Sequence, residues 1–466
     1  MIRASALHPL SLTLFLVLSP MLFFCAASAQ DTRVVTEPKY PPACSVIPAT
    51  LDWNGNLPES QNTKLSTAAI QSALDKCSSG HAVVLRARDG HNAILTGALS
   101  LHAGVTLLVE KGVHLVASNL PSDYERTPSS CGITDAKGGG CNPLIRADHA
   151  HGSAIMGEGV IEGRGDLPMA NSPMSWWQMH DQVKGDVHHN IPWLIGTDET
   201  NNFTLYRIML HSAPNFNVFL QGGDGITVWG IRIDAPWNSP NTDGIDPSGS
   251  TNVTVTQSYI RNGDDGIAIK APAGKPARHI TVSHDHFYEG HGMSIGSGTE
   301  GGVSDVLFTD LTIDHQKSGL HIKSNPGRGG LVNNVRYEDV CIRDTTMPIL
   351  FETTYIDANA PKSGWINGAK LPVFRNITLH NVVSTGGSRL VLSGVDAQHR
   401  TQVLFDGLDI EGADSMKQNV EHSEITVGPS SSNWIPKGPD TTVTGETDAP
   451  VTRFSCTNKF VPFPLP

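Results

Sequence analysis

The chain has 466 residues, of which 39% are hydrophobic and 17% are charged, with 46 glycines and 30 prolines. Enough apolar residues are present to form a core, which excludes a disordered chain, and the glycines follow no period, which excludes collagen. The formal net charge of −12 disfavours nucleic acid as a partner, because proteins that bind polyanions usually carry a basic surface.

Residues 1–29 have the pattern of a secretory signal peptide. Arg3 precedes an apolar run from Leu10 to Phe24, and Ala27-Ser28-Ala29 supplies small residues for cleavage before Gln30. The apolar run is short for a membrane span, and no other run reaches ~18 apolar residues. The sequence therefore predicts a secreted protein, extracellular or periplasmic before release, that does not associate with a membrane.

A short amphipathic helix is predicted at residues 66–77. Ile70, Ala73, Leu74 and Cys77 recur at helical spacing behind a Ser/Thr start. We expect this helix to cover the N-terminal end of the core that the following residues form.

The middle of the chain repeats a phrase of alternating apolar residues at intervals of roughly 25 residues. Its clearest copies begin at Ile226, Val306 and Val335. Because side chains alternate between the two faces of a strand, each copy predicts two short strands joined by a bend, with their apolar residues on one face.

A second phrase lies between these copies, in which apolar residues stand one and three positions after a glycine. Its glycines are Gly244, Gly266, Gly292 and Gly319. Each repeat therefore holds about three short strands, which is typical of a solenoid whose coils stack into parallel sheets. The repeat is too short to hold a helix in every coil. The sequence predicts an all-β protein, a right-handed parallel β-helix.

A solenoid grows by adding coils, so one domain can cover residues 30–430. Residues 431–466 are rich in Ser, Pro, Thr and Gly, and we expect them to form an irregular tail held by Cys456. Without the signal peptide, an even number of cysteines remains, which predicts disulfide bonds in an exported chain. Of the many possible pairings we favour neighbours along the chain: Cys131–Cys141, which bracket a glycine-rich loop, then Cys44–Cys77 and Cys341–Cys456. Zinc is the alternative, but no C-x-x-C spacing supports a metal site.

Aligning the repeats on the second phrase predicts a column of polar side chains outside one sheet. Residues two and four positions after each glycine point outward, and they include Asp246, Lys270, Ser294, His321 and Lys323. The glycines themselves predict a bare strip of backbone, which would let a ligand approach closely in a groove.

Three carboxylates and a histidine stand beside this column, where the chain bends into each strand. They are Asp243, Asp264, Asp265 and His291. Aspartates can stack in solenoids for structural reasons, but Asp264 and Asp265 are adjacent and face Asp243 from the next coil. Close like charges cost stability, so the arrangement favours catalysis. The lysines of the column add positive charge, which suits an acidic sugar.

This chemistry indicates hydrolysis of a glycosidic bond. One carboxyl group must be protonated to donate to the leaving oxygen, and another must be ionised to activate water or to attack directly. A like-charged neighbour raises one pKa and separates the two roles. A separation of ~6.5–9.5 Å between the groups leaves room for water and gives inversion.

Four motifs resemble those of polygalacturonases, glycoside hydrolase family 28. They are Asn241-Thr242-Asp243, Gly263-Asp264-Asp265, Gly290-His291-Gly292 and Ile322-Lys323, in the family's order and spacing. The resemblance covers roughly residues 40–430 and is nearest to bacterial endopolygalacturonases. It implies a pectin-lyase-like β-helix that hydrolyses α-1,4-linked galacturonan with inversion. We expect polygalacturonate or pectin as the partner, no cofactor and a monomer.

The resemblance also implies a role for each residue. Asp264 would be the general acid, Asp243 and Asp265 would hold and deprotonate the water, and His291 would keep the acid protonated or orient the site. The residues expected to bind substrate are Asn241, Asp246, Lys270, His321, Lys323 and Tyr355, the last resembling the family's substrate-contacting tyrosine.

The chain departs from the family at His321, where the fourth motif usually reads Arg-Ile-Lys. Arginine grips a carboxylate with two parallel hydrogen bonds, and histidine cannot. We therefore expect His321 to bind a substrate carboxylate only when protonated, so that KM rises with pH.

Three other functions share part of this pattern. A hydrolase of rhamnogalacturonan or xylogalacturonan would have the same fold, a pectate lyase would need calcium and an arginine base, and a sugar-binding solenoid would not cleave. The three aspartates favour plain polygalacturonate. Endo action is expected on the resemblance only.

Overall fold

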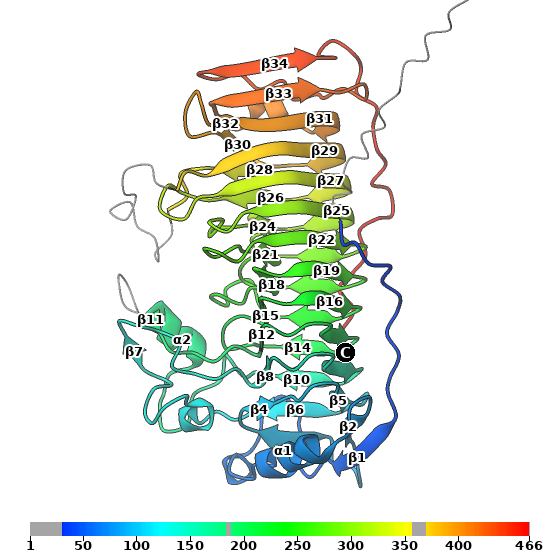
Figure 1. Cartoon of the computed structure of the whole chain (residues 1–466), viewed down its shortest axis with the longest axis vertical. Helices are drawn as coiled ribbons and strands as arrows, with labels where there is room; N and C mark the ends of the chain where they lie inside the picture. Colours follow the sequence, from blue (N-terminus) through cyan, green and yellow to red (C-terminus); the bar gives the residue numbers. More distant parts are fainter. Residues whose placement is uncertain (1–29, 183–187, 357–369, 466) are drawn as a thin grey trace, which may run out of the picture.

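The computed structural model describes residues 30–182, 188–356 and 370–465. The predicted signal peptide lies outside these residues. Strands stack coil upon coil along one long axis, from the blue N-terminal end to the red C-terminal end (Figure 1). No helix among the described residues is long and apolar enough to span a membrane.

Strands of successive coils pair in parallel and form three ladders along this axis. The first ladder consists of β1 (Ala43–Pro48), β2 (Ala82–Arg86), β5 (Thr106–Val109), β9 (Ala154–Gly157), β13 (Thr204–Tyr206), β16 (Asp224–Trp229), β19 (Thr251–Thr256), β22 (Ala277–Ser283), β25 (Val303–Asp314), β27 (Leu331–Arg343), β29 (Val373–Thr385), β31 (Thr401–Ile410), β33 (Ser423–Val427) and β34 (Thr441–Gly445). The second ladder consists of β3 (Ala93–Thr96), β6 (His114–Ala117), β10 (Val160–Glu162), β14 (Met209–His211), β17 (Arg232–Asp234), β20 (Tyr259–Arg261) and β23 (His286–Tyr288), which then joins β25.

The third ladder carries the predicted polar column. It consists of β4 (Leu99–Ser100), β8 (Ile145–Asp148), β12 (Ile195–Asp198), β15 (Val218–Gln221), β18 (Ile245–Ser248), β21 (Ile267–Ile269), β24 (Met293–Ile295), β26 (Ser318–Lys323), β28 (Met347–Glu352), β30 (Arg389–Ser393) and β32 (Lys417–Glu421). A short antiparallel pair, β7 (Thr134–Asp135) and β11 (His188–His189), lies outside the ladders. The all-β prediction of a parallel β-helix is confirmed.

The repeated alternating phrase forms the first two ladders. The copy that begins at Ile226 becomes β16 and β17, whereas the copies that begin at Val306 and Val335 each become one long, bent strand, β25 and β27. The bend recurs at one register position in successive coils, where the backbone is left-handed with φ between 51° and 64°: Gly230, Gln257, His284, Asp310, Asp339 and Asn381. Stacking stabilises these bends, since the side-chain amide of Asn381 donates to Asp339 at 2.8 Å.

The ends of the core are covered by a helix and by an additional strand. The predicted capping helix is α1 (Thr67–Lys76), which buries Ile70 and Leu74 and packs against β1, β2 and β4. Its Ser66 makes no side-chain cap. At the other end the tail is less irregular than predicted, because β34 pairs with β33 and its Val443 packs on the core.

A second helix, α2 (Trp176–Asp181), was not predicted. It begins with a capping box, in which the Ser175 hydroxyl accepts from the Gln178 backbone N–H and the Gln178 side chain accepts from Ser175 N–H. Single turns of 3-10 helix occur at Glu59–Gln61, Pro121–Tyr124 and Ala413–Ser415.

Three disulfide bonds join the cysteines in the favoured pairs: Cys44–Cys77, Cys131–Cys141 and Cys341–Cys456. The first ties the strand β1 to the end of α1, and the last ties the tail to β27. The disulfide prediction is therefore confirmed.

Two extended segments run along the outside of the coils, and both lie on one flank of the molecule in Figure 1. In the N-terminal strap (residues 30–42), Asp31 accepts from the Thr254 hydroxyl at 2.7 Å and Arg33 donates to the Gly225 carbonyl at 2.5 Å. In the C-terminal strap (residues 446–465), Lys459 contacts Asp310 at 2.8 Å. Each strap thus makes hydrogen bonds or ion pairs with several successive coils.

Candidate active site

The polar column lies on the outer face of β18, β21, β24 and β26, as the alignment of repeats predicted. Ile245, Ile267, Met293 and Leu320 are partners in successive strands, and all four are fully buried in the core. The intervening side chains therefore point out of the sheet. Among them Ser294 and His321 are direct partners.

The glycines of the column serve the stacking of the coils rather than the approach of a ligand. A Cβ atom on Gly244 would lie 2.3 Å from the carbonyl oxygen of Gly266, and one on Gly292 would lie 2.3 Å from that of Gly319. A side chain at either position would force adjacent coils apart. The predicted bare strip of backbone is thus occupied by the next coil.

Each of the three aspartates has its own basic partner. Oδ1 of Asp264 lies 3.0 Å from Nδ1 of His291, and Oδ2 of Asp265 accepts from Nζ of Lys323 at 2.7 Å. Oδ2 of Asp243 accepts from the ammonium of Lys270 at 3.2 Å. Asp264, Asp265 and His291 each place a ligand atom within 4.8 Å of the others. The structure therefore brings the predicted catalytic residues together.

The three carboxylates differ in exposure, which separates what they can touch. The side chain of Asp264 is 25% exposed, against 6% for Asp243 and 4% for Asp265. Asp264 can therefore reach a bound ligand directly. Asp243 and Asp265 can contact only a small molecule such as water between them and the groove.

The environment shifts the pKa values of these carboxyl groups in opposite directions. Burial, reinforced by the charge of Asp246, raises the pKa of Asp243 well above its usual range. Burial would also raise the pKa of Asp264, but the hydrogen bond and charge of His291, with Lys323, outweigh it and lower that pKa. In this arrangement His291 favours the ionised form of Asp264, which disfavours the implied role of keeping that acid protonated; the other implied role, orienting the site, stays a prediction.

Two residues predicted to bind substrate form an ion pair with each other. Asp246 is fully buried, and its carboxylate contacts the ammonium of Lys270. The same ammonium lies 5.0 Å from the centre of the Phe216 ring. Burial raises the pKa of Asp246 to about 6, although Lys270 opposes the shift. Lys270 is thus committed to Asp243 and Asp246 and is not free to bind a carboxylate of the substrate.

His321 is also placed differently from the prediction. It is 4% exposed, and burial followed by the charge of Lys323 lowers its pKa. The structure therefore disfavours the expected protonated contact with a substrate carboxylate, because the ring is enclosed and its pKa is lowered. Tyr355 covers this part of the column, with Nζ of Lys323 5.1 Å from its ring centre. Lys323 itself is buried between Asp265 and that ring.

Asn241 lies at the edge of the groove, in a left-handed conformation with φ 49°. Its side-chain oxygen contacts Nε2 of His180 on α2, and the His180 ring packs edge-on against His189, with centroids 4.3 Å apart. The sequence analysis did not identify His180. The capping box at Ser175 was the available signal that a helix begins there.

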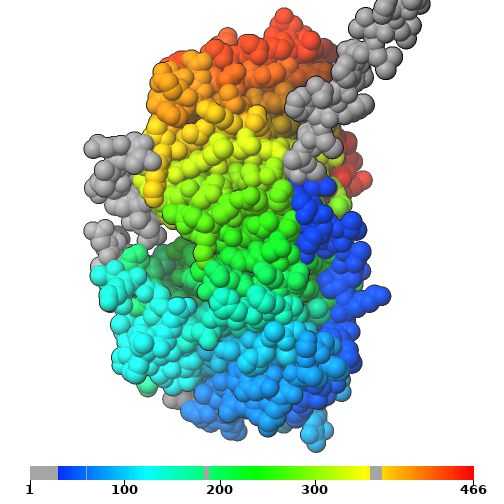
Figure 2. Space-filling view, viewed as in Figure 1, coloured from blue at the N-terminus to red at the C-terminus, as the bar shows by residue number. Residues whose placement is uncertain are grey.

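A cavity of about 610 Å³ continues along the third ladder toward the N-terminal end. It lies over β8, β12 and β15 and includes Arg126, Arg146, Trp193 and Gln221 in its lining. Figure 2 shows a hollow between the cyan outer segment and the green coils. The three aspartates do not line this cavity, but it lies over β15, which pairs with β18 next to Asp243.

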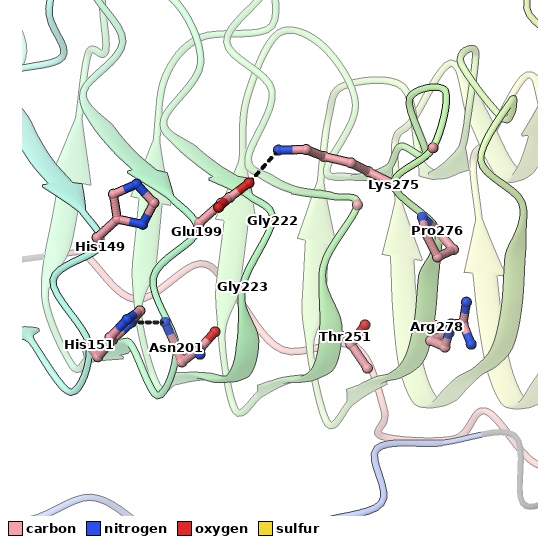
Figure 3. Close-up of a pocket in the computed structure, with 12 residues that line it drawn as sticks. His149, His151, Glu199, Asn201, Gly222, Gly223, Thr251, Lys275, Pro276 and Arg278 are labelled. Atoms are coloured by element: carbon pink, nitrogen blue, oxygen red, sulfur yellow. Dashed lines mark hydrogen bonds and ion pairs between the residues drawn. The ribbon is translucent and has the colours of Figure 1, made fainter.

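A separate open cavity of about 670 Å³ lies where the third ladder turns into the first (Figure 3). His149, Glu199 and Lys275 line it, and Lys275 is paired with Glu199 at 2.9 Å. None of the three aspartates lines this cavity. The candidate active site is therefore the outer face of β18, β21, β24 and β26, where the three aspartates and their basic partners lie.

A parallel β-helix with three aspartates on adjacent coils defines a class of carbohydrate-active protein, and comparison with known families agrees. Residues 106–429 match the family model described as glycosyl hydrolases family 28. The chain belongs to this family.

The relatives cover nearly the whole chain. It is 39% identical to the endo-polygalacturonase of Pectobacterium carotovorum subsp. carotovorum, over 84% of this chain and 92% of that protein. It is 34% identical to the polygalacturonase of Ralstonia nicotianae, over 86% of this chain and 85% of that protein. The solved polygalacturonase from Erwinia carotovora ssp. carotovora has a TM-score of 0.77 at 36% identity, covering 85% of this chain and 100% of that chain.

Proposed function

We propose that this protein is a polygalacturonase that hydrolyses α-1,4-galacturonosyl linkages within polygalacturonate or pectin. The observation that carries the proposal is the set of Asp243, Asp264 and Asp265 on neighbouring coils, each with a basic partner, in a member of glycosyl hydrolases family 28. Lys270 and Lys323 neutralise part of the charge of the buried carboxylates, and Arg126 and Arg146 add positive charge over the neighbouring coils, which favours an anionic sugar although the chain is acidic.

Asp264 acts as the general acid in this proposal, because it is the most exposed of the three carboxyl groups. Oδ1 of Asp264 and Nδ1 of His291 lie 3.0 Å apart, close enough to pass a proton, and an imidazolium that gives up the proton remains as a neutral imidazole. The carboxylate of an arriving sugar adds negative charge beside Asp264, which raises the pKa of Asp264 and moves the proton onto it. Asp264 then donates this proton to the leaving glycosidic oxygen.

Asp243 and Asp265 hold the attacking water and take its proton. Oδ1 of Asp243 is buried and accepts no hydrogen bond from the described residues, which supports a role in binding water. The water oxygen forms the new bond to the anomeric carbon on the face opposite the leaving oxygen. The reaction therefore inverts the configuration, because no carboxylate attacks the sugar.

The groove supports endo action, and the Pectobacterium relative is itself an endo-polygalacturonase. Arg146, Gly196, Phe219 and Asp246 are partners in successive strands, so Arg146 lies three coils from Asp246. At ~4.8 Å per coil this is about 14 Å, the length of several sugar units. A galacturonate chain can thus extend past the aspartates toward Arg126 and Arg146.

The protein is further proposed to be a secreted monomer that needs no cofactor and binds no membrane. The three disulfide bonds support an oxidising compartment. α1 covers the N-terminal end of the core and leaves no open edge there for a second copy.

Product analysis tests the proposal. Chromatography of products from polygalacturonic acid should show a ladder of oligomers early in the reaction, and proton NMR should show β-configured reducing ends first. Monomer alone would refute endo action, and an α product would refute inversion. Asp264→Asn should lower turnover by at least ~10²-fold while binding survives, because an amide is not a general acid. Cleavage of rhamnogalacturonan or xylogalacturonan in preference to polygalacturonate would favour the related hydrolases.

A further inference from the structure

His321 is enclosed within the polar column, and only 4% of it is exposed. It stands between Ser294 and Leu350 in the outward row of the third ladder. Its ring packs edge-on against Tyr355, with centroids 6.3 Å apart. A side chain so enclosed cannot meet a substrate, so its role lies in the residues that it contacts.

A chain of hydrogen bonds connects His321 to Asp265 through Ser294. The Ser294 hydroxyl donates to Oδ1 of Asp265 at 2.7 Å and lies 3.1 Å from Nδ1 of His321. Ser294 is fully buried, so these are the contacts that decide where its hydroxyl points. The other carboxylate oxygen of Asp265 is held by Lys323.

A hydroxyl group has one proton, and its direction decides what Asp265 receives. When Ser294 donates to Asp265, its oxygen can only accept from His321, so Nδ1 must carry a hydrogen. A ring without hydrogen at Nδ1 would compete with Asp265 for the hydroxyl proton. The tautomer of His321 therefore sets the hydrogen bonding of Asp265.

We infer that His321 is a positioning residue for Asp265: its Nδ1–H keeps the Ser294 hydroxyl directed at the carboxylate, which fixes that carboxylate toward the attacking water. The inference rests on the proposed function, since Asp265 needs this orientation only if it acts on water. It explains why a histidine at this place is buried against a serine and a tyrosine.

The charged groups around His321 do not disturb this arrangement. Lys323, Asp265 and Glu352 face the ring, and Nε2 lies 3.8 Å from Oε1 of Glu352, beyond hydrogen-bond distance. A second proton would add at Nε2, next to Glu352, and would leave Nδ1–H in place. The Asp265–Ser294–His321 chain is thus the same in both protonation states, so KM should not rise between about pH 5.5 and 7.5 through this residue.

Kinetics of three variants on polygalacturonate test the inference. His321→Ala and Ser294→Ala should each lower kcat by about tenfold or more, the scale of one hydrogen bond to a charged group, with KM within about twofold. His321→Asn should recover most of the loss, because its amide N–H₂ takes the place of Nδ1–H. The double alanine variant should be no slower than either single variant, since both break one chain.

A histidine–hydroxyl contact elsewhere in the fold controls for the general effect of removing a half-buried histidine. Nδ1 of His286 lies 2.7 Å from the Thr312 hydroxyl in the second ladder, away from the aspartates. His286→Ala should leave kcat unchanged, and thermal unfolding should confirm that every variant is folded. Ser294→Ala removes a single oxygen, so it keeps the test valid if His321→Ala does not fold.

Three outcomes would overturn the inference: unchanged kcat in both alanine variants, a raised KM with kcat intact, or additive losses in the double variant. Failure of the proposed function looks different. In that case the wild-type protein does not cleave polygalacturonate, or Asp265→Asn retains full activity.

Discussion

Replacing Asp246 with asparagine should stabilise the protein at neutral pH. Asp246 and Asp243 are both buried and share the ammonium of Lys270, so two carboxylates face one positive charge. Burial, opposed by Lys270, raises the pKa of Asp246 to about 6. An aspartate in the unfolded chain has a pKa of about 3.9.

This difference of roughly two pKa units corresponds to about 3 kcal/mol. Because the pKa is higher in the folded state, ionising Asp246 costs folding free energy, and the cost grows as the pH rises from about 4 through about 6. Asparagine keeps the shape of the neutral acid and never ionises. The free energy of unfolding of D246N should exceed that of wild type by about 1.5 kcal/mol at about pH 5 and by about 3 kcal/mol at about pH 8.

Urea denaturation at both pH values, with the disulfide bonds intact, measures the difference. Asp198→Asn is the matched control, since Asp198 stands at the outer end of β12 and accepts from Gln221 at 3.0 Å; it should change the free energy of unfolding little. If D246N is less stable than wild type at the higher pH, or the difference does not grow with pH, the ion pairs of Lys270 outweigh the cost of burial and the reasoning is refuted.

Three further perturbations address other parts of the molecule. His291→Ala removes the hydrogen bond that lowers the pKa of Asp264, so the loss of kcat/KM at high pH should move to higher pH while the maximal rate falls; a pH profile with an unmoved limb would contradict this. Arg146→Ala should raise KM for long oligogalacturonates and not for short ones, and an equal effect on both would exclude a distal contact. Replacing Cys341 and Cys456 by serine should lower the free energy of unfolding by about 2–5 kcal/mol in urea denaturation; an unchanged midpoint would mean that the C-terminal strap is held without the bond.

The period of the sequence was enough to predict the fold. Alternation around Ile226 and Val306 defined strands, and the spacing of the glycines defined coils, because both patterns follow from local backbone geometry. α2 was missed because it is only six residues long and lies in a loop that does not follow the repeat. β34 was missed because its residues Thr441–Gly445 contain a single apolar side chain, Val443, that reaches the core.

For the site, the sequence predicted on which side of the sheet a side chain lies, but not which other side chains bury it. Period-two alternation correctly placed Asp246 and His321 outside the core, yet both are buried under other side chains. What covers them comes from elsewhere in the fold: Phe216 beside Lys270, and Tyr355 beside His321. A pattern within one strand contains no information on such neighbours, so the charge state of His321 could not be predicted from it.

The straps change how this solenoid can come apart. In a one-dimensional stack each coil contacts only its neighbours, and fraying can travel inward from either end. Glu37 and Asp31 connect the N-terminal strap to coils from β13 to β22, and Arg453 and Leu465 connect the C-terminal strap to coils from β31 to β17. The coils that carry the three aspartates lie within both spans. Fraying from either end therefore reaches these coils only after a strap has detached. The amide hydrogens of the coils that carry the aspartates should consequently exchange together, in one cooperative unit.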